Sequence, residues 1–164
     1  MQLAGADVAA QLTTLGFTHA VWLPDSAIGP WEDAFTQSAH LRLIRVCREG
    51  EAWGIAAGLE LGGARPIVIM QSTGFFESGD SLRNALFDLK LPLYAIVGHR
   101  SSLVPNSPDT ARLFLEPILR AWGIDFVTLD GAAGRAPLGQ LAEHVAQCRT
   151  AARPGVAVLP EGRM

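Results

Sequence analysis

The chain has 164 residues, a usual length for a single domain. Its net charge is −3 and it contains no basic run or basic-aromatic cluster, so we expect no nucleic-acid partner. Hydrophobic residues make up 49% and charged residues 18%, and this second fraction is below the roughly 25% of an average domain. This apolar composition favours a buried subunit interface.

Nothing in the sequence predicts a targeting signal or a membrane segment. The amino-terminal residues lack the basic start and long apolar core of a signal peptide, and no apolar run is long enough to span a bilayer. The two cysteines, Cys47 and Cys148, are about 100 positions apart and lack metal-ligand spacing. We therefore expect free thiols, a cytoplasmic location and no membrane partner.

Apolar periodicity predicts helices and strands that alternate along the chain. In chain order we expect a helix over 6–17, a strand over 19–24, a helix over 28–38, a strand over 41–46, a helix over 49–61, a strand over 66–71, a loop over 72–80, a helix over 81–89, a strand over 92–98, a helix over 107–123 interrupted at Pro117, a strand over 124–129, a helix over 137–152 and a strand over 155–160. The strands are apolar on both faces. They predict an α/β fold with a six-stranded parallel sheet and helices on both faces.

Ligands of such sheets bind beyond the carboxyl ends of the strands. This rule selects the loops that follow the first five strands, which are 24–29, 47–52, 71–80, 98–107 and 130–137. None has a GxxxxGK or GxGxxG phosphate loop or a GxSxG nucleophile elbow. HExxH, CxxC and clustered histidine–carboxylate patterns are also absent, so we expect no metal bound by residues of this chain.

Two glutamates, Glu49 and Glu51, stand where the strand over 41–46 gives way to the next helix. Either could be a solvated first-turn charge, because the helix dipole favours an anion there. The helix also contains Gly54 and Gly58, and an interior glycine costs about 0.5–1 kcal/mol relative to alanine. We infer that another helix or a flat ring approaches this helix closely. Glu49 would then be shielded from water and able to exchange protons.

Residues 49–58 (EGEAWGIAAG) fit the pattern E-x4-G-I-A-x-G, and the segments 66–74 (PIVIMQSTG) and 94–100 (YAIVGHR) follow it. Together they resemble the pyrimidine-binding (PYR) domain of thiamin-diphosphate-dependent 2-oxo acid decarboxylases. The form REGE is most similar to the alpha subunit of sulfopyruvate decarboxylase and to phosphonopyruvate decarboxylase. The resemblance implies that residues 1–164 form a single thiamin-diphosphate pyrimidine-binding domain of the PYR-type fold.

The resemblance also assigns roles to individual residues. Glu49 is the implied catalytic residue, since in this family the matching glutamate hydrogen-bonds N1′ of the cofactor's aminopyrimidine and so activates the thiazolium carbon. The implied cofactor-binding residues are Glu49, Gln71, Ser72, Thr73, Gly74 and Phe75. Gly74 would allow a close approach to the backbone, whereas Phe75 could equally pack in the core.

The implied substrate-binding residues are Pro24, Asp25, Ser26, His99 and Arg100. An acid with a second anionic group needs cations or N–H donors, which His99 and Arg100 could supply. They could instead be a surface histidine and an arginine paired with a nearby carboxylate. The longer loop over 75–80 and the lack of a PQH stretch leave the exact 2-oxo acid open, between sulfopyruvate-like and phosphonopyruvate-like compounds.

The sequence contains no GDG motif, which in these enzymes begins the site for the diphosphate and Mg²⁺. The resemblance therefore implies a partner beta subunit that carries GDG and holds Mg²⁺, with thiamin diphosphate shared between the chains. We expect a hetero-oligomer built on dimers and an enzyme that is active only with its partner. Three alternatives stay open: a thiamin-dependent carboligase or synthase subunit, a non-catalytic binding or scaffold subunit, and a flavodoxin-like ligand-binding domain that works alone.

Overall fold

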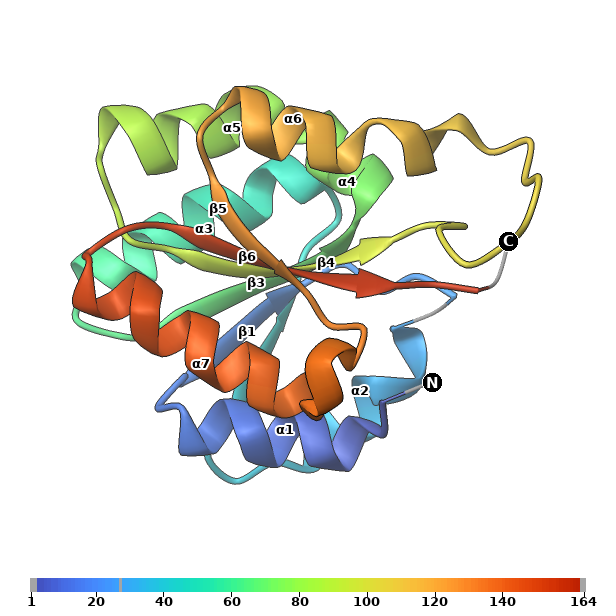
Figure 1. Ribbon diagram of the computed structural model, residues 1–164. Coiled ribbons are helices and arrows are strands. Elements are labelled where there is room, and N and C mark those ends of the chain that lie inside the picture. The colour runs from blue at the N-terminus through green and yellow to red at the C-terminus, as the bar shows by residue number, and fades with distance from the viewer. Residues whose placement is uncertain (1–2, 27, 163–164) are drawn as a thin grey trace.

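A computed structural model of the chain describes residues 3–26 and 28–162, so residue 27 of the loop over 24–29 lies outside the described ranges. Within these ranges, six strands form one sheet in the order β2-β1-β3-β4-β6-β5, and every neighbouring pair is parallel (Figure 1). The strands are β1 (His19–Trp22), β2 (Arg42–Arg45), β3 (Pro66–Gln71), β4 (Tyr94–His99), β5 (Asp125–Thr128) and β6 (Gly155–Pro160). This sheet confirms the predicted α/β fold class.

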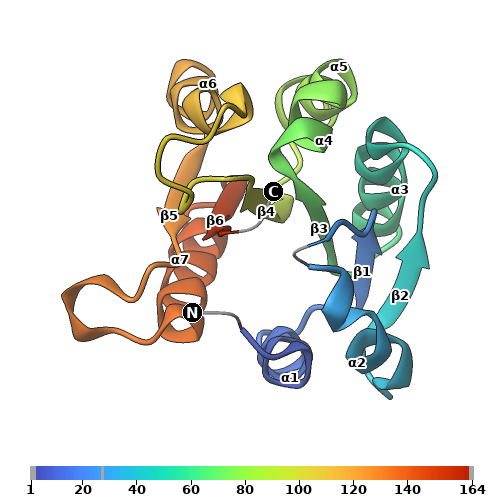
Figure 2. The same ribbon diagram turned by 90° about the vertical axis from the view of Figure 1, so that its right-hand side faces the viewer.

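Helices cover both faces of the sheet (Figure 2). One face carries α3 (Glu49–Leu61), α4 (Ser72–Glu77), α5 (Gly79–Arg83) and α6 (Leu115–Ala121), and the other carries α1 (Gly5–Thr14), α2 (Glu32–Gln37) and α7 (Pro137–Thr150). Short 3-10 turns lie at Gly29–Trp31, Thr110–Leu113 and Ala132–Gly134, and a π-helical turn lies at Asn84–Asp88. Among the described helices, none is both long and apolar enough to cross a membrane.

The sheet separates two hydrophobic cores. Successive side chains of β3 alternate between them, because neighbouring residues of a strand point to opposite faces. Val68 and Met70 pack towards α3, whereas Ile67 and Ile69 pack towards α1 and α7, and all four are at most 1% exposed. Burying an aliphatic side chain of this size stabilises the fold by about 1.5–3 kcal/mol. Burial on both faces explains why β3 reads as a continuous apolar run.

The prediction of a loop over 72–80 is wrong, because α4 and the start of α5 occupy this segment. The segment is held by a buried contact: the Trp53 Nε1–H donates to Ser78 Oγ at 2.9 Å. The Ser78 hydroxyl in turn donates to the Phe75 carbonyl at 3.1 Å. Serine and glycine are weak helix formers, and here tertiary packing overrides their propensity.

The predicted helix over 107–123 begins later than expected. A 3-10 turn ends at Leu113 and α6 begins at Leu115, so the interruption lies at Phe114. Pro117 is in the first turn of α6, where a backbone N–H would have no partner within the helix. The proline is therefore compatible with this helix and does not break it.

Candidate functional site

The carboxyl ends of the strands form one edge of the sheet, which faces the viewer in Figure 2. The chain leaves this edge after β2 to begin α3 and after β3 to begin α4. Because β1, β3, β4 and β6 are consecutive neighbours in the sheet, the segments that follow them lie side by side. The segment after β2, which begins α3, is next to the one after β1, and the predicted site residues are at the ends of β3 and β4 or on the segments that follow β1, β2, β3 and β4.

Glu49 lies directly against the backbone of Gly74. Glu49 is the first residue of α3, and Gly74 is in the first turn of α4. A Cβ atom at position 74 would lie 2.4 Å from Glu49 Cγ and 2.5 Å from its Oε1. The glycine thus makes room for the Glu49 side chain, and the two parts of the sequence pattern meet in space. We expected the cofactor to approach the Gly74 backbone closely. In this structure the Glu49 side chain lies against that backbone.

Contacts from the end of α4 fix the start of α3. The Gly50 N–H donates to Glu77 Oε2 at 3.1 Å, and Arg48 Nη2 pairs with Glu77 Oε1 at 2.5 Å. The hydrogen bond from Arg48 lowers the pKa of Glu77, so this carboxylate stays ionised. Glu51 is exposed and accepts a hydrogen bond from the Cys47 N–H at 3.2 Å, as a first-turn helix charge does.

The other predicted cofactor residues differ in accessibility. Gln71 and Thr73 are half-buried. Ser72 is fully buried at the start of α4, and its Oγ has no hydrogen-bond partner among the described residues. Phe75 is 1% exposed, and its ring lies edge-on to Trp53 with centroids 6.5 Å apart. This burial favours the core-packing alternative for Phe75.

The predicted substrate residues after β1 form a turn. Pro24 and Ser26 are exposed, whereas Asp25 is half-buried. The Asp25 Oδ1 atom accepts a hydrogen bond from the Ile28 N–H at 2.9 Å, and the Asp25 carbonyl accepts one from the Gly29 N–H. The turn therefore holds Asp25 at the carboxyl edge of the sheet.

His99 and Arg100 have partners inside the segment that follows β4. His99 is buried, and its Nε2 contacts the Arg112 carbonyl at 3.0 Å. The Arg100 Nε pairs with Asp109 Oδ2 at 2.7 Å. Arg100 thus pairs with a nearby carboxylate, which was the alternative to a role in substrate binding. His99 is held by a backbone carbonyl of the same chain.

Glu161, directly after β6, is a residue of this edge that the sequence reasoning missed. It is 6% exposed, and a Cβ atom at Gly98 would lie 1.9 Å from its Oε1, an atom without a hydrogen-bond partner in the described ranges. Burial and the negative charge of Asp25 raise the pKa of Glu161 to about 8, against an opposing effect of Arg100. Glu161 follows the sixth strand, whereas the sequence-based site residues all came from the loops after the first five strands.

Residues 3–105 match the family described as thiamine pyrophosphate enzyme, N-terminal TPP binding domain, and the chain belongs to this family. The matched part runs from α1 to just beyond β4 and so includes Glu49 and Gly74.

The individual relatives that the chain resembles are named as decarboxylases. The chain is 32% identical over 98 residues to phosphonopyruvate decarboxylase of Streptomyces viridochromogenes, covering 60% of this chain and 25% of that protein. It is 31% identical over 94 residues to phosphonopyruvate decarboxylase of Streptomyces hygroscopicus, covering 57% and 23%. It is also 32% identical over 65 residues to sulfopyruvate decarboxylase subunit alpha of Methanocaldococcus jannaschii, covering 40% and 38%. The matches thus span about a quarter of each phosphonopyruvate decarboxylase.

Proposed function

We propose that the chain is the pyrimidine-binding alpha subunit of a two-chain, thiamin-diphosphate-dependent 2-oxo acid decarboxylase. Its substrate would be a small anionic 2-oxo acid, sulfopyruvate-like or phosphonopyruvate-like, as the names of the relatives suggest. The observation that carries the proposal is the contact between Glu49 and the Gly74 backbone. This contact places the Glu49 carboxylate, at the start of α3, beside the first turn of α4, which we propose lies against the cofactor ring.

The residues present fit the pyrimidine half of the cofactor. Thiamin diphosphate, when bound, supplies the nucleophilic carbon and the electron sink for decarboxylation. Glu49 would hold a proton at N1′ of the aminopyrimidine, and Gly74 leaves room for the Glu49 side chain beside the α4 backbone. The buried Ser72 Oγ, with no hydrogen-bond partner among the described residues, could pair with a polar atom of the ring.

We place the diphosphate and Mg²⁺ on a partner beta subunit with a GDG motif. The surface of α3 supports the approach of a second chain, because Gly54 and Gly58 are exposed and an added Cβ atom would meet none of the described atoms within 4 Å. Ile55 and Leu61 are also exposed, by 36% and 69%. A hetero-oligomer built on dimers and a cytoplasmic location are further parts of this proposal.

Co-expression of the chain with a GDG-bearing partner tests the activity. The readout is carbon dioxide released from sulfopyruvate, phosphonopyruvate and related 2-oxo acids. We expect Glu49→Gln to lower kcat by about 10²–10⁴-fold, the usual contribution of a positioned acid–base group. Glu51→Gln is the matched control, since Glu51 is in the same helical turn and should leave the rate unchanged. An undiminished rate in Glu49→Gln would refute the proposed role.

Two further measurements separate the alternatives. Product analysis distinguishes release of an aldehyde from carboligation to a second carbonyl compound. Titration of the two-chain complex with thiamin diphosphate distinguishes an enzyme from a scaffold. A complex that binds no thiamin diphosphate would contradict the proposal and favour a scaffold subunit.

A further inference from the structure

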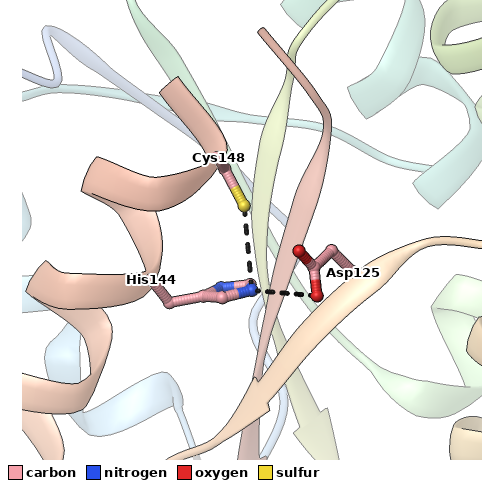
Figure 3. A group of neighbouring side chains, drawn as sticks. All are labelled: Asp125, His144 and Cys148. Atoms are coloured by element: carbon pink, nitrogen blue, oxygen red, sulfur yellow. Dashed lines mark hydrogen bonds and ion pairs between the residues drawn. The ribbon is translucent and has the colours of Figure 1, made fainter. Parts of the chain in front are cut away.

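A second cluster of polar side chains lies at the opposite, amino-terminal edge of the sheet (Figure 3). Asp125 is the first residue of β5, and His144 and Cys148 are one turn apart on α7. The His144 and Cys148 side chains are buried, whereas the Asp125 side chain is 40% exposed. One oxygen, one nitrogen and one sulfur atom of these residues lie within 4.8 Å of one another.

The thiol and the carboxylate both face the same nitrogen of the imidazole. His144 Nε2 is 3.7 Å from Cys148 Sγ and 3.7 Å from Asp125 Oδ1. A catalytic cysteine–histidine–aspartate triad needs the thiol and the carboxylate on opposite ring nitrogens. The other nitrogen, Nδ1, instead contacts the Tyr94 hydroxyl at 2.5 Å. Burial also raises the pKa of Cys148 to about 11, which disfavours a free nucleophilic thiolate. The arrangement is therefore not a triad.

The three atoms instead lie within 4.8 Å of one another, and the two separations from His144 Nε2 can be compared with those of a tetrahedral cation site. Zinc binds nitrogen and oxygen at about 2.0–2.2 Å and sulfur at about 2.3 Å, so tetrahedral ligand atoms are about 3.4–3.6 Å apart. The two separations of 3.7 Å from His144 Nε2 are within a few tenths of an ångström of this value. At 3.7 Å the contact between His144 and Asp125 is too long for a hydrogen bond.

Neighbouring residues hold each of these atoms in place. The Tyr94 hydroxyl fixes the imidazole ring with Nε2 directed at the cluster. Arg153 Nη2 binds Asp125 Oδ2 at 3.1 Å, which leaves Oδ1 on the side of His144. A Cβ atom at Gly155 would lie 2.5 Å from Cys148 Sγ, so only glycine leaves room for the sulfur. Such supporting contacts are typical of metal sites.

Two of the three side chains lie next to space that is open to solvent. Cys148 and Tyr94 line a cavity of about 260 Å³ together with Val145. Asp125 is partly exposed on the adjacent surface. A catalytic or exchangeable zinc site keeps a fourth coordination position for water.

We propose that Asp125 Oδ1, His144 Nε2 and Cys148 Sγ bind a divalent cation of the zinc type. The mixed oxygen, nitrogen and sulfur set suits Zn²⁺, and binding displaces the thiol proton into solvent so that a thiolate is the ligand. The ion would join β5 to α7 far from the carboxyl edge. We expected no metal from the sequence, because the two ligands on α7 become a site only with Asp125 from another element.

Titration of the chelator-treated 164-residue chain with Co²⁺ tests this proposal. We expect a thiolate-to-cobalt charge-transfer band together with the visible absorption of tetrahedral Co²⁺, both displaced by Zn²⁺. The charge-transfer band should be absent in Cys148→Ser and unchanged in Cys47→Ser, the matched control at the exposed thiol. Tyr94→Phe should weaken Co²⁺ binding by about 10–100-fold, the usual effect of losing a partner of a ligating histidine. Absence of the band in the unmodified chain, or its loss in Cys47→Ser, would overturn the proposal.

A second measurement covers the case in which Cys148→Ser fails to fold. Asp125→Asn alters a partly exposed residue and keeps the size of the side chain. We expect Zn²⁺ to raise the Tm of the unmodified chain and to leave the Tm of Asp125→Asn unchanged, because binding to the native state alone stabilises it. An equal rise in both proteins, or no rise in either, would contradict the site.

Discussion

Gly74→Ala is the sharpest test of how the chain positions Glu49. The substitution adds one methyl group at a place where its carbon would lie 2.4 Å from Glu49 Cγ, 2.5 Å from Oε1 and 2.7 Å from Cδ. Ordinary van der Waals contact begins at 3.4 Å. The Glu49 carboxyl group must therefore move by about 1 Å, since it is the mobile end of a half-buried side chain and the α4 backbone is fixed.

The effects on rate and on stability should differ. A misplacement of about 1 Å can cost about 10²-fold in rate, which is about 2.7 kcal/mol of activation free energy. The unfolding free energy should change by less than about 1 kcal/mol, because alanine is better than glycine in a helix by about that amount and the side chain can yield. Gly74→Ala should thus fold and react slowly.

The assay compares kcat of the proposed two-chain enzyme with urea unfolding of the 164-residue chain for the same variant. Gly139→Ala is the matched control, because Gly139 is exposed on α7 and an added Cβ atom would meet none of the described atoms within 4 Å. It should raise stability by up to about 1 kcal/mol and leave kcat unchanged. Our reasoning fails if Gly74→Ala keeps the full kcat, or if it loses activity only in proportion to the loss of folded protein.

Three more predictions concern other positions. Gly98→Ala should lower the unfolding free energy by about 1–3 kcal/mol, because its Cβ atom would overlap Glu161 Oε1, and adding Glu161→Ala should recover part of this loss in urea unfolding. Burial raises the pKa of Glu161 from its ordinary 4.5 to about 8 in the folded protein. Between these two pH values the native state binds more protons than the unfolded state, so the contribution of Glu161 to stability falls as the pH rises from 4.5 to 8. Glu161→Gln should make the pH dependence of Tm flatter from pH 4.5 to 8, and an unchanged slope would contradict the raised pKa. Gly54→Leu should keep the Tm of the isolated chain and prevent co-purification with the proposed beta subunit, whereas normal assembly would exclude this face of α3 from the interface.

The sequence predicted the helices and strands whose buried residues form a regular apolar pattern along the chain. The bounds of α3, β3 and β6 agree with prediction, because a glycine or proline marks at least one end of each apolar run. The segment over 72–80 was missed because serine and glycine normally mark turns. Its helices depend on Phe75 and Ser78 packing against Trp53, which is distant in the sequence. Tertiary contacts of this kind leave no local pattern.

The candidate site was predictable only in part, for the same reason. The spacing after Glu49 identified the glutamate, and the resemblance supplied Gly74. The parts played by Glu77 and Glu161 depend on which strands are neighbours in the sheet, since Glu161 meets Gly98 only because β4 pairs with β6. The composition of the chain does not reveal this pairing.

The contacts that hold the start of α3 also bear on how subunits would assemble. Glu77 binds the Gly50 N–H, and Ser78 binds the Trp53 indole, so the first turns of this helix are ordered by the chain itself. The conformational entropy that is lost when Glu49 is oriented therefore lowers the free energy of unfolding. It does not reduce the affinity for a partner chain. Substitutions at Glu77 or Ser78 should therefore alter the yield of folded alpha chain more than the affinity between chains. The chain would meet its partner as a preorganised surface.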